Sequence, residues 1–310
     1  MTFTVIPVPA MGAEDVLVGA DGAAWTGTED GSIWRIDASG ATVRKVADTG
    51  GRPLGLEWLP DDSLLVCDAR RGLLRVDVDT GAVDDLVTEV DGRPMCFCNN
   101  AAVAGDGGIW FTDSSTKHPI DRWKHDFIQD TRTGRLLHRS ADGETRVVLH
   151  GLAFANGVAL APDENWVAVA ETAARSVVRY ELTGPRAGRR EFLVDDLPGY
   201  PDNIALGSDG LVWVSLASPR DPLVERLQRM PLLVRRLVTA VPEWLQPAPK
   251  QTVRAQAYDA DGRLVHDIDV ATSDYHMVTG VREHEGRVWL GSLHEGAVAV
   301  LDLGDSVSGG

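Results

Sequence analysis

Six stretches of the chain repeat the same order of polar and hydrophobic positions. Each opens on a polar or small pair, continues through alternating apolar residues to an acidic turn, and resumes in a strand rich in Val or Trp. The opening residues and the first acids of the turns are Glu14 and Asp21, Leu54 and Asp61, Asn99 and Asp106, Asn156 and Asp163, Asp202 and Asp209, and Thr279 and Glu285. The two lie seven positions apart in the first five copies and six apart in the last. Because a slip of one residue would turn every side chain to the other face, this constancy predicts a repeated strand, turn and strand.

Further strands complete each repeat. Third strands such as Ser32–Ile36 and Gly72–Val76 are rich in apolar and β-branched residues, and fourth strands are visible at Thr145–Leu149 and Leu264–Ile268. Six units of about four strands predict an all-β fold, a six-bladed β-propeller that occupies residues 1–310 as a single domain. The last unit lacks a fourth strand. We therefore expect Phe3–Ile6 to fill that place and close the ring.

Two segments depart from the repeat. Residues 219–247 are expected to form a short helical insertion between blades five and six, because apolar side chains recur every three to four positions from Leu223 to Trp244. The insertion has two candidate roles: packing against a blade, or covering the axial pocket as a lid. Residues Lys117–Asp130 in the third blade are expected as a long loop that is either solvated or shapes the pocket mouth.

The opening residues of the six copies carry the candidate chemistry. The innermost strands of a propeller surround its axis, so these residues are expected to form a ring, namely Glu14, Leu54, Asn99, Asn156, Asp202 and Thr279. Asn and Asp before a strand are also common turn residues, but their shared register favours metal ligands. Two carboxylates and two carboxamides supply oxygen only, which suits a hard cation such as Ca²⁺, with another divalent metal as the alternative. The ring has no His or Cys, which argues against zinc.

The net charge and the cysteine content restrict the classes of binding partner and the cellular compartment that we expect. The formal net charge of −16 argues against nucleic acid and an anionic membrane, which both attract cationic surfaces. Three cysteines make a disulfide framework unexpected, and neither an export signal nor a long apolar span is visible. We therefore expect a cytoplasmic protein that binds a small-molecule substrate and needs no obligate protein partner.

Several phrases make the chain resemble the strictosidine synthase-like branch of the SMP-30/gluconolactonase/paraoxonase-type propellers. They span almost the whole chain: Gly12–Asp15, Gly51–Leu56, Phe111–Ser115, Phe154–Glu164, Gly199–Ile204 and Glu283–Leu293. The resemblance implies a Ca²⁺-dependent hydrolase of lactones or related esters, with the metal on Glu14, Asn99, Asn156 and Asp202. Thr279 stands where plant strictosidine synthases carry a glutamate, so condensation chemistry is not expected. Phe97 replaces an arginine of the sugar lactonases, which favours a more apolar substrate.

These residues suggest a mechanism in which the axial ion polarises a substrate carbonyl and water attacks it. Asp202 is the first candidate to orient or deprotonate that water, and His276 is the alternative base. Phe97, Asn100, Asp113, Asn203 and Thr279 are expected to line the substrate pocket. Two other readings stay open: a non-catalytic binding propeller whose ion is structural, and a lyase or isomerase that acts on a natural-product intermediate.

Overall fold

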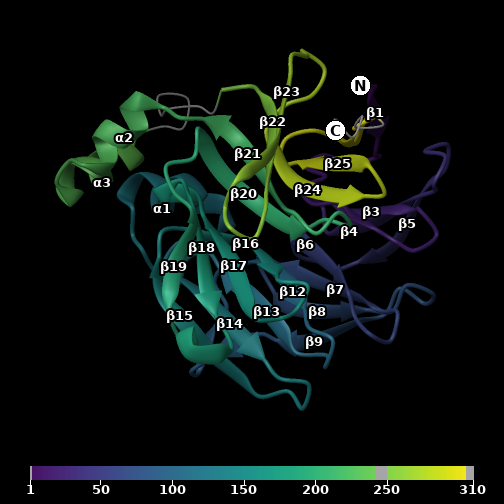
Figure 1. Ribbon diagram of the computed structural model, residues 1–310, viewed down its shortest axis with the longest axis horizontal. Coiled ribbons are helices and arrows are strands. Elements are labelled where there is room, and N and C mark those ends of the chain that lie inside the picture. Colours follow the sequence, from purple (N-terminus) through teal and green to yellow (C-terminus); the bar gives the residue numbers. More distant parts are fainter. Residues whose placement is uncertain (1, 242–249, 305–310) are drawn as a thin grey trace.

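The chain folds into six four-stranded antiparallel sheets arranged around a central axis, a six-bladed β-propeller (Figure 1). The structure is a computed structural model, and it describes residues 2–241 and 250–304. The blades follow the sequence, and in the first five the innermost strand comes first along the chain. The predicted architecture is therefore confirmed.

The first three blades contain β2 to β9 and β12 to β15, with a small hairpin before the third. Their bounds are β2 (Leu17–Val18), β3 (Ala24–Gly27), β4 (Ser32–Ile36), β5 (Val43–Asp48), β6 (Pro53–Trp58), β7 (Leu64–Asp68), β8 (Gly72–Val76), β9 (Val83–Val87), β12 (Cys98–Val103), β13 (Ile109–Asp113), β14 (Gly134–Arg139) and β15 (Thr145–Leu152). The hairpin pairs β10 (Glu89–Val90) with β11 (Arg93–Pro94).

The last three blades contain β16 to β26. Their bounds are β16 (Ala155–Leu160), β17 (Trp166–Glu171), β18 (Ser176–Glu181), β19 (Arg190–Val194), β20 (Gly199–Leu206), β21 (Val212–Pro219), β22 (Val253–Tyr258), β23 (Leu264–Val270), β24 (Val278–His284), β25 (Arg287–Ser292) and β26 (Ala297–Asp302). The N-terminal β1 (Phe3–Pro7) pairs with β26 and completes the sixth blade, as predicted. The two ends of the fold therefore meet in one sheet.

The acidic turns form because their first residue caps the turn. The side chain of Asp61 accepts a hydrogen bond from the amide of Ser63, and Asp106 and Asp209 do the same for the residue two positions on. Such local hydrogen bonds make Asp a favoured turn residue. The sixth turn is shorter because Glu285 and Gly286 both have positive φ, which allows a two-residue hairpin loop.

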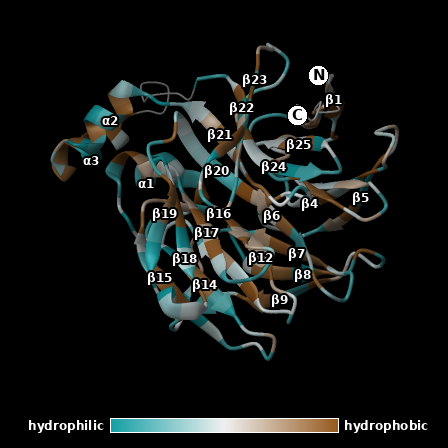
Figure 2. Cartoon of the chain, in the orientation of Figure 1, coloured by the Kyte–Doolittle hydropathy of each residue, from teal (hydrophilic) through white to brown (hydrophobic). Residues whose placement is uncertain are grey.

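The hydrophobic core lies between neighbouring blades. Ala168 and Ala170 of the fourth blade, for example, share one buried cluster with Ile204, Val214 and Leu216 of the fifth. Figure 2 shows apolar residues along strands inside the propeller such as β7, β8 and β17. Blade-to-blade packing of this kind holds the innermost strands at fixed distances from the axis.

Helices occur at one end of the propeller. The predicted insertion contains α2 (Pro222–Gln228) and α3 (Leu232–Thr239), which Figure 1 shows outside the ring of blades, while its residues 242–247 lie outside the described part. Asp221 caps α2 by accepting from the amide of Leu223, and Pro222 occupies the first turn. The described residues contain no helix with both the length and the apolarity needed to cross a bilayer.

The prediction of a loop at Lys117–Asp130 is wrong for part of this segment. The segment contains the 3₁₀ turn Ile120–Arg122 and the helix α1 (Trp123–Gln129). Two further 3₁₀ turns, η2 (Thr172–Ala174) and η3 (Gly184–Arg186), lie later in the chain. The side chain of Asp126 in α1 accepts hydrogen bonds from Ser115 and Thr131, which fixes the helix to the end of blade three.

Candidate metal centre and pocket

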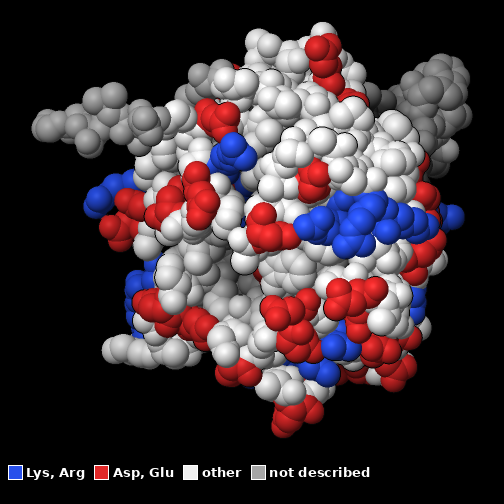
Figure 3. Space-filling model, turned by 90° about the vertical axis from the view of Figure 1, so that its right-hand side faces the viewer, with Lys and Arg blue, Asp and Glu red and all other residues white. Residues whose placement is uncertain are grey.

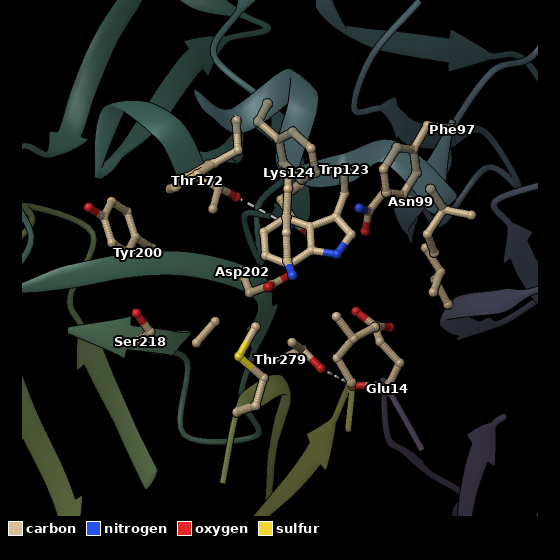
Figure 4. Close-up of a pocket in the computed structure, with 18 of the residues that line it drawn as sticks. Glu14, Phe97, Asn99, Trp123, Lys124, Thr172, Tyr200, Asp202, Ser218 and Thr279 are labelled. Carbon is tan, nitrogen blue, oxygen red and sulfur yellow. Dashed lines mark hydrogen bonds between the residues drawn. The ribbon is translucent and has the colours of Figure 1, made fainter. Parts of the chain in front are cut away.

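The six predicted ring residues lie together at the floor of one pocket. Glu14, Leu54, Asn99, Asn156, Asp202 and Thr279 all line it, and Figure 4 shows Glu14, Asn99, Asp202 and Thr279 around a common centre. Five of the six begin or closely follow the start of an innermost strand, and Glu14 precedes β2. The repeat in the sequence therefore corresponds to convergence in space.

A β-bulge at the same register turns the ring residues toward the axis. In β12, Asn99 and Asn100 lie between the paired residues Cys98 and Ala101, and the strand opposite has only Thr112 there. The innermost strands of blades two, four, five and six show the same shift in register at their ring residues. A bulge bends the strand and re-aims a side chain, which explains why polar residues leave the sheet here.

Hydroxyl groups set the orientation of both asparagines. Asn99 Nδ2 donates to Ser114 Oγ at 2.8 Å, and Asn156 Nδ2 donates to Thr172 Oγ1 at 3.2 Å. With the amide nitrogens held in this way, Asn99 Oδ1 and Asn156 Oδ1 are buried and have no hydrogen-bond partner. Buried polar atoms nearly always have partners, so two unpaired oxygens in one ring are suited to coordinate a cation.

Glu14 adds a third such oxygen. Its Oε1 accepts from Asn203 Nδ2 at 3.2 Å, whereas its buried Oε2 has no partner. Thr279 Oγ1 donates to the backbone carbonyl of Glu14 at 2.8 Å and so ties the last blade to the first. Glu14 therefore keeps one carboxylate oxygen available at the axis.

Burial disfavours the ionised form of both axial carboxylates. Burial raises the pKa of Glu14 well above its usual value, and the charges of Asp202 and Asp15 raise it further. The guanidinium of Arg52 and the hydrogen bond from Asn203 act in the opposite direction. Burial likewise raises the pKa of Asp202 to about 7. A divalent cation among these oxygens would relieve the repulsion and favour the ionised forms.

This donor set fits a hard divalent ion. Glu14, Asp202, Asn99 and Asn156 offer oxygen only, the ligand type that Ca²⁺ prefers. Within the described residues, no cluster of three or more His, Cys, Asp or Glu side chains is suited to a metal. A metal at this ring must therefore use the carboxamide oxygens together with the two carboxylates.

The position after each ring residue alternates between a polar side chain and glycine. Asp15, Asn100 and Asn203 alternate with Gly55, Gly157 and Gly280 around the ring. A Cβ atom at Gly157 would lie 2.0 Å from the amide nitrogen of Ile204, because the strand of the next blade passes there. The polar side chains instead cross between blades, as where Asn100 Oδ1 accepts from the amide of Val158 at 2.9 Å.

Four predicted residues therefore do not line the pocket. Asn100 and Asn203 lie behind the ring, where they bridge blades. Asp113 lies behind Phe97: it accepts from the Phe97 amide at 2.8 Å and pairs with Arg135 at 2.9 Å. His276, the alternative base, pairs through Nδ1 with Glu295 beside the pocket.

The walls above the ring are mainly apolar, and most of them were not predicted. Phe97 is the wall residue that the sequence did predict. Its ring packs edge-to-face against that of Phe154, with ring centroids 5.5 Å apart. Residues of α1 and α2 contribute as well, and Figure 4 shows Trp123 and Lys124 over the ring. The remaining wall residues are Ile120, Phe127, Ile128, Thr172, Tyr200, Ala217, Ser218, Asp221, Val224, Met277 and Leu293.

Comparisons with known proteins agree with this architecture. The model of the SMP-30/Gluconolactonase/LRE-like region matches residues 17–229. The adipocyte plasma membrane-associated protein of Salmo salar is 33% identical over 94% of this chain and 77% of its own. Protein STRICTOSIDINE SYNTHASE-LIKE 6 of Arabidopsis thaliana is 32% identical over 94% of this chain and 78% of its own.

Solved structures share the fold at lower sequence identity. A gluconolactonase from Xanthomonas campestris superposes with a TM-score of 0.71 at 18% identity, over 97% of this chain and 88% of its own. Regucalcin from Agrobacterium tumefaciens, described as a calcium-binding protein, superposes with a TM-score of 0.65 at 17% identity. The match covers 95% of this chain and 90% of regucalcin. On the family match and the two relatives above, the chain belongs to the SMP-30/gluconolactonase/LRE-like family.

Proposed function

We propose that this chain is a Ca²⁺-dependent hydrolase that opens a lactone or cleaves a related ester above the axial ring. The observation that carries the proposal is the set of buried, unpartnered oxygens of Glu14, Asn99 and Asn156, which lie with Asp202 at the floor of a pocket. Membership of a family named for gluconolactonase and the fold shared with a gluconolactonase support it.

The ion would be held by Glu14 Oε2, Asn99 Oδ1, Asn156 Oδ1 and the carboxylate of Asp202. When bound, Ca²⁺ supplies a Lewis acid that polarises a carbonyl and stabilises the oxyanion formed by attack. Asn203 fixes the side chain of Glu14 from behind the ring, and Thr279 fixes the backbone of Glu14 from within it. Ser114 and Thr172 hold the two carboxamides with their oxygens toward the axis.

Asp202 is the residue that we assign to proton transfer. It lines the pocket, and without a cation burial raises its pKa to about 7. As a carboxylate it can accept a proton from an attacking water. A hydrogen bond from Asn156 lowers that pKa, and a cation beside Asp202 would lower it further. The pairing of His276 with Glu295 outside the pocket favours Asp202 over His276.

The walls favour an apolar substrate. Phe97, Trp123 and Phe127 surround the space above the ring, and Lys124 is the one cationic side chain among the lining residues. Aromatic and aliphatic walls gain most from excluding water around an alkyl or aryl group, whereas a polyhydroxylated sugar would leave its hydroxyls without partners. We therefore propose an alkyl or aryl lactone or ester.

The test is a panel of γ- and δ-lactones and aryl esters, assayed with chelator and after Ca²⁺ is restored. We expect hydrolysis that chelator abolishes and Ca²⁺ recovers. Asp202→Asn should lower kcat by about a hundredfold or more, because it removes the general base and one carboxylate ligand of the ion. Asp302→Asn, on the exposed end of β26, is the matched control and should retain activity.

The result against the hydrolase would be a folded, ion-loaded protein that is inert toward the whole panel. Such a protein would be a binding propeller with a structural ion. Turnover that converts a substrate without taking up water, detected by product mass, would instead indicate a lyase or isomerase.

A further inference from the structure

The helix α3 has its apolar and polar sides reversed relative to an ordinary surface helix. Its Leu233 and Leu237 side chains are 70% and 63% exposed, whereas Thr239 is only 3% exposed. Thr239 Oγ1 accepts from Gln129 Nε2 of α1 at 2.9 Å, and Arg235 donates to the Gln129 carbonyl. A surface helix normally buries its apolar side, so the exposed leucines of α3 need a different explanation.

These leucines belong to a larger apolar surface, which we call the helix patch. It consists of Leu223, Leu232, Leu233, Val234, Leu237 and Val241. Six of the ten exposed large hydrophobic residues in the described part of the chain fall in this short segment. Figure 2 shows brown residues at the outer end of α3. Scattered apolar residues are normal on a surface, but such a concentration marks an interaction site.

The charge around the helix patch is opposite to that of the whole molecule. Residues 220–241 contain five arginines and two acidic residues, within a chain of net charge −16. Arg226, Arg229 and Arg236 are exposed, and no ion pair to a described residue is formed by any of them. Figure 3, which views the side away from α2 and α3, shows many Asp and Glu residues together with a band and several smaller patches of Lys and Arg.

We propose that α2 and α3 dock on an anionic phospholipid surface. Exposed leucines would enter the boundary between headgroups and acyl chains, and the arginines would reach the phosphate and carboxylate groups of the lipids. The net charge of the chain predicted no membrane partner, but that charge is unevenly distributed. The acidic body is repelled by such a surface, so approach through the helical end is favoured.

Two features favour lipid over a second copy of the chain. In a two-fold symmetric dimer through the helix patch, Arg226, Arg229 and Arg236 of one copy would lie near those of the other, without acidic partners. Lipid headgroups supply the negative charge that these arginines lack. Since Val224 of α2 turns inward and lines the pocket, docking would also hold the pocket beside the lipid surface.

Flotation of the full-length protein with lipid vesicles tests the proposal. We compare vesicles of phosphatidylcholine alone with vesicles in which about a third of the lipid is phosphatidylserine. The expected result is enrichment on the anionic vesicles that weakens as salt is added. Leu233→Ser/Leu237→Ser should lower this binding roughly tenfold, and Arg226→Ala/Arg229→Ala/Arg236→Ala should remove the preference for anionic lipid.

Leu264→Ser/Val265→Ser is the matched control, because both side chains are 50% exposed on β23, away from the helices. It should bind vesicles like the wild type, and circular dichroism should show that all variants fold. The proposal is overturned if the wild type floats with neither vesicle, or if the helix-patch variant binds as well as the control. It is also overturned if sedimentation shows a dimer without lipid that Leu233→Ser/Leu237→Ser dissociates.

Discussion

Asn99 and Asn156 differ from ordinary buried asparagines because only half of each carboxamide is satisfied. Their nitrogens are held by Ser114 and Thr172, and their oxygens are left to the axis. The cost of burying an unpaired carbonyl oxygen is typically about 1–3 kcal/mol, which a bound cation would offset. These hydroxyls therefore belong to the candidate metal centre although neither faces the axis as a ring residue.

Replacing Thr172 tests this role. Thr172→Val removes the hydroxyl that holds Asn156, so the carboxamide can rotate, and we expect Ca²⁺ affinity to fall roughly tenfold, as is typical for groups that orient a ligand. The measurement is calorimetric titration with Ca²⁺. Ser176→Ala in the same blade is the control, because its buried hydroxyl has no partner. Equal affinities for the two variants would contradict the assigned role.

Gly157 tests how closely the innermost strands approach one another. Gly157→Ala places a methyl group 2.0 Å from the amide nitrogen of Ile204, so we expect a loss of about 2–4 kcal/mol in the free energy of unfolding. Gly105→Ala is the control, since its added carbon would meet only the end of the Glu164 side chain at 3.2 Å. Chemical denaturation of both variants gives the comparison, and a Gly157→Ala protein as stable as the control would refute the close approach.

At the level of single elements, ring closure depends on β1. Val5 pairs with Ala299 and packs on the buried cluster of blades five and six, whereas Thr4 in the same strand is exposed. Val5→Lys should therefore lower the free energy of unfolding by about 1–3 kcal/mol and promote aggregation through the exposed edge of β26.

Thr4→Lys is the matched control because it adds the same charge to the other face of β1. Thermal unfolding followed by circular dichroism distinguishes the two variants. A similar melting temperature for both would mean that β1 does not close the ring.

The sequence predicted the strands well because the repeat constrains their register, and it predicted the helices of the insertion from a long apolar period. It did not predict α1, whose apolar positions Trp123, Phe127 and Ile128 span only two turns beside Pro119. The β-bulges were also missed. A bulge adds one residue to a strand without changing its composition, so periodicity alone does not reveal it.

Single residues whose position differs from the expectation show local features that periodicity does not reveal. His276 pairs with Glu295, and the next residue, Met277, has a φ of 54° just before β24. The sequence did contain a pattern that could have predicted the roles of Ser114 and Thr172. Each follows the acidic residue that ends the second strand of its blade, Asp113 or Glu171. Blade two has Ala69 at that place, and its ring residue Leu54 has no carboxamide to orient.

At the scale of the whole molecule, six blades bring distant residues to one axis. The ring residues extend from Glu14 to Thr279 along the chain, and only a closed propeller places them around a common centre. Their convergence was predictable from the repeat. The aromatic walls were not, because they come from α1, α2 and loops that follow no repeat.

Equilibrium Ca²⁺ binding to chelator-treated protein tests the central claim most directly. Calorimetric titration should show one ion bound per chain, and Asn99→Leu/Asn156→Leu should abolish the binding while leaving the propeller folded by circular dichroism. A wild-type protein that binds no Ca²⁺, or a double variant that binds it as tightly as the wild type, would contradict the assignment of the axial ring as a metal centre.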